Sequence, residues 1–118
     1  MTVDPAIVLP PQVVGPSLTA AGLASWVFAH GGREQEAAEC GRLQDFIDAA
    51  LRRGLGTEVR APRPVVCRAA DLWAEASGLA DSLAALTEGK VSAEWRRHAE
   101  RLRVRAQSLR RVLGTAGP

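Results

Sequence analysis

Two apolar repeats in the second half of the chain constrain its fold more than any other feature. Their gaps alternate between three and four residues, the heptad spacing that gathers apolar side chains on one face of an α-helix. The first repeat consists of Ala69, Leu72, Ala76, Leu79, Leu83 and Leu86, and the second of Trp95, Ala99, Leu102, Ala106, Leu109 and Leu113. We predict helices over about 68–86 and 93–113, the latter capped by Ser92 and stopped at Gly114, packed as an antiparallel hairpin around the turn TEGKV.

Two further helices are predicted in the first half of the chain. Ser17 can cap a helix over 18–30 that stops at a pair of glycines. The segment 33–53 begins with acids and ends with arginines, the order that the helix dipole favours. Prolines exclude a helix from the connection 54–66. The four helices predict an all-α fold, a four-helix bundle that forms one domain over 17–114. Its predicted core contains Leu72, Leu79, Leu83, Leu102, Leu109 and Trp95, joined by Trp26 and Phe46.

The segments outside the predicted bundle are an N-terminal arm over residues 1–16 and a short tail over 115–118. Residues 1–16 are apolar but interrupted by four prolines, so we predict an extended arm instead of a helix. A small monomer lacks the surface to bury all of this segment, which favours contact with a protein partner or a second copy. The apolar residues predicted to make that contact are Ile7, Val8, Leu9, Val13 and Val14.

The chain start does not resemble a secretory signal or a membrane span. Asp4 and the prolines replace the basic and apolar segments of a signal peptide, and the predicted helix over 18–30 is shorter than the roughly 20 apolar residues that a span requires. We therefore expect a cytoplasmic protein. In that compartment Cys40 and Cys67 are expected to be reduced thiols.

Sequence motifs give no positive sign of catalysis. The candidate metal ligands, which are His30, Cys40, Cys67 and His98, lie ten or more residues apart, so no metal or other cofactor is expected. Neither a phosphate-binding loop, nor a nucleophile elbow, nor a zinc-protease motif occurs, and no nucleophile is paired with a base. We predict a protein that is not an enzyme.

The predicted last helix carries most of the positive charge. Seven arginines and two acids give residues 92–118 a net charge of +5, whereas the whole chain carries +2. Arg96, Arg103 and Arg110 form a row seven residues apart. In an antiparallel hairpin this row faces Trp73, Ala80 and Thr87, none of them acidic, so the hairpin is not expected to neutralise it, whereas Glu75 and Arg105 could meet on the other edge.

Three interpretations of the arginine row remain open. It can be a solvated face in a protein whose preference for arginine over lysine indicates GC-rich, bacterial codon usage. It can pair with acids of the second helix or of another subunit. It can also bind the phosphates of nucleic acid. We predict a non-catalytic protein–protein interaction module, an adaptor or small assembly subunit, that binds a protein partner or forms a homo-oligomer; the alternative is a nucleic-acid-binding protein that uses the arginine-rich helix.

Overall fold

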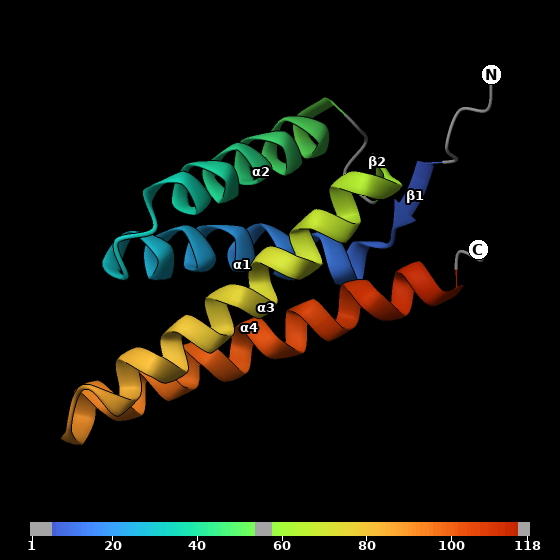
Figure 1. The fold of residues 1–118 in the computed structure, drawn as a ribbon. Helices are drawn as coiled ribbons and strands as arrows, with labels where there is room; N and C mark the ends of the chain where they lie inside the picture. The colour runs from blue at the N-terminus through green and yellow to red at the C-terminus, as the bar shows by residue number, and fades with distance from the viewer. Residues whose placement is uncertain (1–5, 54–57, 116–118) are drawn as a thin grey trace.

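The chain folds into four helices and two short strands over the residues that the computed structural model describes, 6–53 and 58–115 (Figure 1). Residues 1–5 of the predicted arm and 116–118 of the predicted tail lie outside them. The elements are β1 (Ala6–Leu9), α1 (Pro11–His30), α2 (Glu34–Arg53), β2 (Val59–Pro62), α3 (Arg63–Ala85) and α4 (Gly89–Thr115). The prediction of a mostly helical chain with four helices is confirmed.

Helix α1 contacts the other three helices, and α3 crosses it obliquely (Figure 1). The most extensive packing between two helices joins α3 to α4. Ser77 Oγ donates a hydrogen bond to the Ala99 carbonyl at 2.7 Å, and Ser92 Oγ donates one to the Ala84 carbonyl at 2.8 Å. Since the late part of α3 contacts the early part of α4, the two helices run in opposite directions. None of the described helices combines the length and hydropathy that would let it cross a membrane.

The start of α1 corrects the predicted arm. The prediction that the chain is extended up to residue 16 is wrong for residues 11–16, because α1 begins at Pro11. Proline suits the first helical position, where its missing N–H would have no partner inside the helix. Ser17 is therefore no cap: it is buried within α1, and its hydroxyl donates to the Val13 carbonyl at 2.6 Å. Pro16 lies inside the helix.

The starts of α3 and α4 also differ from prediction. Helix α3 begins at Arg63 instead of 68, because a proline in the first turn does not prevent a helix. Helix α4 begins at Gly89, whose φ of 63° places it in the left-handed region that glycine adopts most readily. Ser92 and Gly114 thus lie within α4 instead of bounding it.

Strands β1 and β2 form an antiparallel pair that the sequence did not predict. In their register Ile7 faces Ala61 and Leu9 faces Val59. These four side chains are buried, whereas Val8 and Arg60 are exposed, as strand alternation requires. The pair joins the N-terminal segment to the connection before α3 and covers one end of the helical core.

The chain contains two units of the same design, β1–α1–α2 and β2–α3–α4. Each strand leads through prolines into a helix whose first turns contain a valine pair, Val13–Val14 or Val65–Val66. Counted from these pairs, equivalent positions are buried in both units. The buried equivalents include Ile7 and Val59, Leu9 and Ala61, Val14 and Val66, Ser17 and Ala69, Ala24 and Ala76, and Phe28 and Ala80.

The predicted core is confirmed in its centre and wrong at one edge. Leu72, Leu102, Leu109 and Trp95 are buried, as expected. Trp26 is instead 44% exposed. The partly buried members of the predicted set, which pack against the core, are Leu79, Leu83 and Phe46.

Candidate functional site

The N-terminal apolar residues are not a free docking surface. Ile7, Leu9 and Val14 are 2%, 5% and 2% exposed, so they belong to the protein's own core. Val13 is partly buried, and Val8 alone among the five remains exposed. The expectation that this segment needs a partner in order to be buried is therefore wrong, because pairing with β2 and the early start of α1 bury it internally.

Two members of the arginine row are neutralised within the chain. Arg110 Nη2 lies 3.8 Å from a carboxylate oxygen of Asp71, and Arg103 Nη1 lies 4.0 Å from one of Asp81. Arg103 also pairs with Glu100 on its own helix. The prediction that the hairpin leaves this row unpaired is wrong for these two arginines. Their long side chains reach past the apolar positions that face them to acids at the edge of α3.

The remaining predicted charge contacts fall differently. Arg96 is exposed and has no carboxylate within 4.0 Å among the described residues. The anticipated pairing of Glu75 with Arg105 is wrong, because Glu75 lies 3.6 Å from Arg33 instead. Arg105 lies instead at the surface between α1 and α4.

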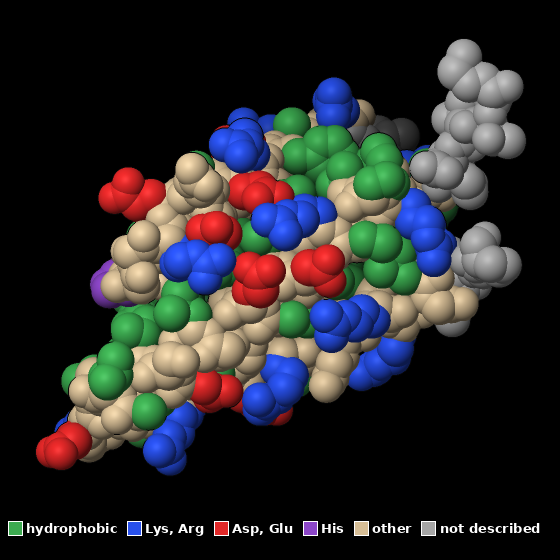
Figure 2. Space-filling model, viewed as in Figure 1, with side chains coloured by type: hydrophobic (Ala, Val, Ile, Leu, Met, Phe, Trp, Pro, Cys, Tyr) green, Lys and Arg blue, Asp and Glu red, His purple; other side chains and the backbone are tan. Residues whose placement is uncertain are grey.

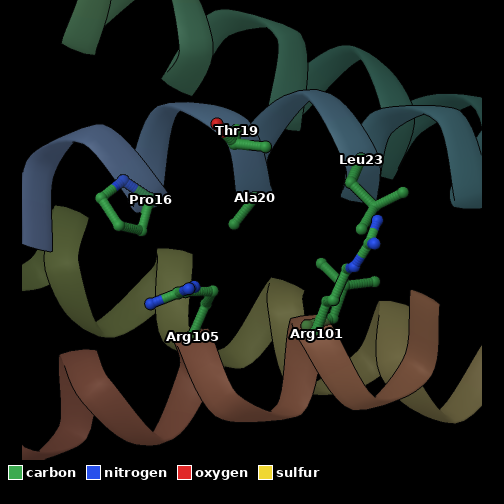
Figure 3. Close-up of a pocket in the computed structure, with 7 residues that line it drawn as sticks. Pro16, Thr19, Ala20, Leu23, Arg101 and Arg105 are labelled. Atoms are coloured by element: carbon green, nitrogen blue, oxygen red, sulfur yellow. The ribbon is translucent and has the colours of Figure 1, made fainter. Parts of the chain in front are cut away.

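That surface is a groove between α1 and α4, with a volume of about 440 Å³ (Figure 3). We call it the α1–α4 groove. Its lining residues are Pro16, Thr19, Ala20, Leu23, Arg101, Leu102 and Arg105. Its floor includes Ala20 and Leu102, both buried. The small side chain of Ala20 leaves the two helices incompletely packed where they pass each other.

The α1–α4 groove carries unbalanced positive charge. Neither Arg101 nor Arg105 lies within 4.0 Å of a carboxylate of the described chain, although other arginines of α4 do. The opposite wall cannot supply one, because α1 contains no aspartate or glutamate. Two cations thus border an apolar floor without a counter-charge.

An aromatic cluster continues the same boundary beyond the groove. It consists of Trp26 and His30 from α1 and Trp95 and His98 from α4. The rings of Trp26 and Trp95 stack with centroids 5.0 Å apart and planes inclined by 23°. Trp26 follows Leu23 by three residues and His98 precedes Arg101 by three, which places cluster and groove on consecutive turns of both helices.

The environment of His98 favours the neutral imidazole. Burial, followed by the positive charge of Arg101, lowers the pKa of His98 below its usual value. Its Nδ1 is buried and has no hydrogen-bond partner in the described part of the chain. His30 is anchored differently, with its Nδ1 3.0 Å from the Trp26 carbonyl oxygen.

Cys40 does not resemble a catalytic thiol. Cys40 is buried, and burial raises the pKa of its thiol to about 12, so the nucleophilic thiolate is scarce at neutral pH. Cys67 is half-buried, and neither cysteine is bridged. Across residues 6–53 and 58–115, no three His, Cys, Asp or Glu side chains come together as a metal site.

The sequence did not single out Arg101, Arg105, Leu23 and Thr19 as one site. A signal was present, because Arg101 and Arg105 lie one helical turn apart and α1 lacks charge. The importance of these residues became clear only from the structure, in which α1 lies beside α4.

No protein-family model, no curated protein and no solved structure matches the chain.

Proposed function

We propose that the protein is a non-catalytic helical interaction module, an adaptor or small subunit of a larger assembly, and that it binds a protein partner through the α1–α4 groove. The observation that carries this proposal is the pair of unpaired arginines, Arg101 and Arg105, over an apolar floor. Arginine and tryptophan are enriched among the residues that contribute most to binding energy. Trp26, 44% exposed beside the groove, adds the second of these residue types.

The bundle would serve as a rigid support for this surface. The antiparallel hairpin of α3 and α4 holds the arginines on a long helix with a continuous apolar face, and the strand pair fixes the start of α1. Positions on such a packed frame change little when a partner binds. We place the protein in the cytoplasm, which is supported by its two unbridged thiols.

A nucleic-acid partner is the weaker candidate. Phosphate binding draws on many free cations, but Arg97, Arg103 and Arg110 each have a carboxylate nearby. Binding phosphates there would bring acids of α3 and α4 into the same interface. The apolar floor of the groove also has no counterpart to contact on a phosphate backbone.

Affinity purification with three versions of the tagged protein tests the proposal. The groove variant carries Arg101→Gln and Arg105→Gln. The control carries Arg42→Gln and Arg53→Gln, which remove the same charge from exposed positions on α2. We expect one protein, or a second copy of this chain, to be recovered in fixed ratio with wild type and control and lost with the groove variant. Equal recovery by all three, or recovery that nuclease abolishes, would contradict the proposal.

A further inference from the structure

We infer that the occupant of the α1–α4 groove is an acidic amphipathic helix, about three turns long, presented by the protein partner. This inference rests on the proposed function and specifies its partner. It draws on the shape of the groove, on its charge, and on a contrast with the α2–α3 boundary.

The shape of the groove favours a rod that lies along both helices. Its walls are α1 and α4, which run alongside each other with Pro16 near Arg105 and Leu23 near Arg101 (Figure 3). From Pro16 to Leu23 the groove wall on α1 is seven residues long, which at a rise of about 1.5 Å per residue is roughly 10 Å. Trp26, one turn beyond the groove, extends this boundary to roughly 15 Å, or about three helical turns.

The backbone of the occupant is expected to be helical. An extended peptide gains affinity by pairing with an open strand edge, and both walls here are helices that already use their own backbone groups. A strand in this groove would therefore leave buried N–H and C=O groups unpaired. A helix satisfies those groups internally.

The charge of the occupant follows from the two arginines. Arg101 and Arg105 are four residues apart, so they project from the same face of α4 about one turn from each other. In Figure 3 the Arg101 side chain extends towards Leu23, and Arg105 lies below Pro16. Carboxylates spaced three or four residues apart on a helix would match this interval, with apolar side chains between them contacting the half-buried Pro16 and Leu23.

The α2–α3 boundary differs from the α1–α4 boundary in that ion pairs bridge it. Where α1 has Pro16 and Leu23, the equivalent positions of α3 are Arg68 and Glu75. Both of these are paired with α2: Arg68 donates two hydrogen bonds to Glu39, at 2.6 and 2.9 Å, and Glu75 meets Arg33. Ion pairs thus bridge the α2–α3 boundary, whereas at the α1–α4 boundary no carboxylate of the described chain lies within 4.0 Å of Arg101 or Arg105. An incoming helix would supply the missing carboxylates.

The test is a selection from a phage-displayed library of random 16-residue peptides against the full-length protein. We expect enriched peptides to carry Asp or Glu three or four residues apart with Leu, Ile or Phe on the same face. Selected peptides are then synthesised, and their affinities are measured by calorimetry and by the change in tryptophan fluorescence as Trp26 is covered. Arg101→Gln with Arg105→Gln should weaken binding at least about tenfold, because each change removes a charge-assisted contact.

A second variant tests the groove by shape instead of charge. Thr19 lines the groove and is exposed, so Thr19→Trp should block it without disturbing the core. We expect this variant to fold, as judged by circular dichroism, and to lose peptide binding. Arg42→Gln with Arg53→Gln should leave affinity within about twofold, since surface charges outside an interface contribute little.

The outcomes separate this inference from the proposed function. If no peptide is enriched, if enriched peptides lack acids, or if mixed-sequence RNA displaces them from the groove, the inference is wrong. When that result coincides with a cellular partner that still depends on Arg101 and Arg105, the proposed function stands with a different kind of occupant. Acidic helices that bind only through an intact groove would support the inference.

Discussion

The three tryptophans occupy three different environments. Trp73 is fully buried, Trp95 is the buried tryptophan of the aromatic cluster, and Trp26 stacks on Trp95 with about half of its surface in solvent. The sequence predicted both Trp95 and Trp26 to be in the core, but it does not tell how far a neighbouring helix extends over a given residue. An exposed tryptophan held by stacking has little conformational freedom to lose, which suits it to contact a partner.

The N-terminal residues give a direct test of the corrected burial pattern. We predict that Ile7→Ala lowers the free energy of unfolding by about 2–4 kcal/mol, because it leaves a cavity in the core. Val8→Ala is the matched control, since Val8 is exposed in the same strand, and should change it by less than about 0.5 kcal/mol. Urea denaturation measures both, and equal effects would show that the strand is not packed as described.

His98 makes stability depend on pH. Because its pKa is lowered in the folded state, the unfolded chain binds more protons as pH falls below about 6.5, and the free energy of unfolding must decrease there. We predict that wild type loses more stability between pH 7 and pH 5 than His98→Gln. Denaturation curves across that range provide the measurement, and parallel pH profiles for the two proteins would contradict the assigned environment.

At the scale of elements, apolar periodicity predicted the last two helices, and capping residues and charge order predicted the first two. Proline led to wrong starts for the first and third helices. The segments 11–16 and 63–67 contain proline, and both form first turns of helices. The β1–β2 pair escaped prediction because its strands are four residues each and their partnership is long-range. The groove escaped for the same reason, since it depends on which helices become neighbours. Local sequence patterns carry no such information.

Pro16 offers a prediction at this scale. It lies inside α1, where it cannot donate the hydrogen bond expected to the carbonyl of Gln12. We predict that Pro16→Ala raises the free energy of unfolding by about 2 kcal/mol, the cost of an internal proline less its restriction of the unfolded chain. Thermal and urea denaturation test this. A destabilised variant would indicate that α1 needs the distortion that proline introduces.

At the scale of the whole molecule, charge is balanced on one face and unbalanced along the α1–α4 boundary. Figure 2 shows acidic and basic side chains next to one another over the middle of one face. Around the α2–α3 boundary, ion pairs join Arg33, Glu36, Glu39, Arg68 and Glu75. The net charge of +2 conceals this division. A surface whose charges are already paired gains little from a charged partner, whereas Arg101 and Arg105 have that capacity unused.

The two boundaries should respond differently to the loss of arginine. We predict that Arg68→Gln lowers the free energy of unfolding by about 1 kcal/mol, because it removes a two-point contact with half-exposed Glu39. Arg101→Gln combined with Arg105→Gln should change it by less than about 0.5 kcal/mol, since neither arginine is paired within the described chain. If the double variant were the less stable protein, the groove arginines would have a structural role.

Site-specific photo-crosslinking in cells tests the central claim most directly. A photoreactive amino acid is placed at Thr19, which is exposed and lines the groove, or at Ala38, which is exposed on α2 and does not. We predict a covalent adduct with one protein from position 19, mapped by mass spectrometry to an acidic helical segment, and its absence from position 38. No adduct at position 19, or the same adducts from both positions, would contradict the assignment of the α1–α4 groove as the docking surface.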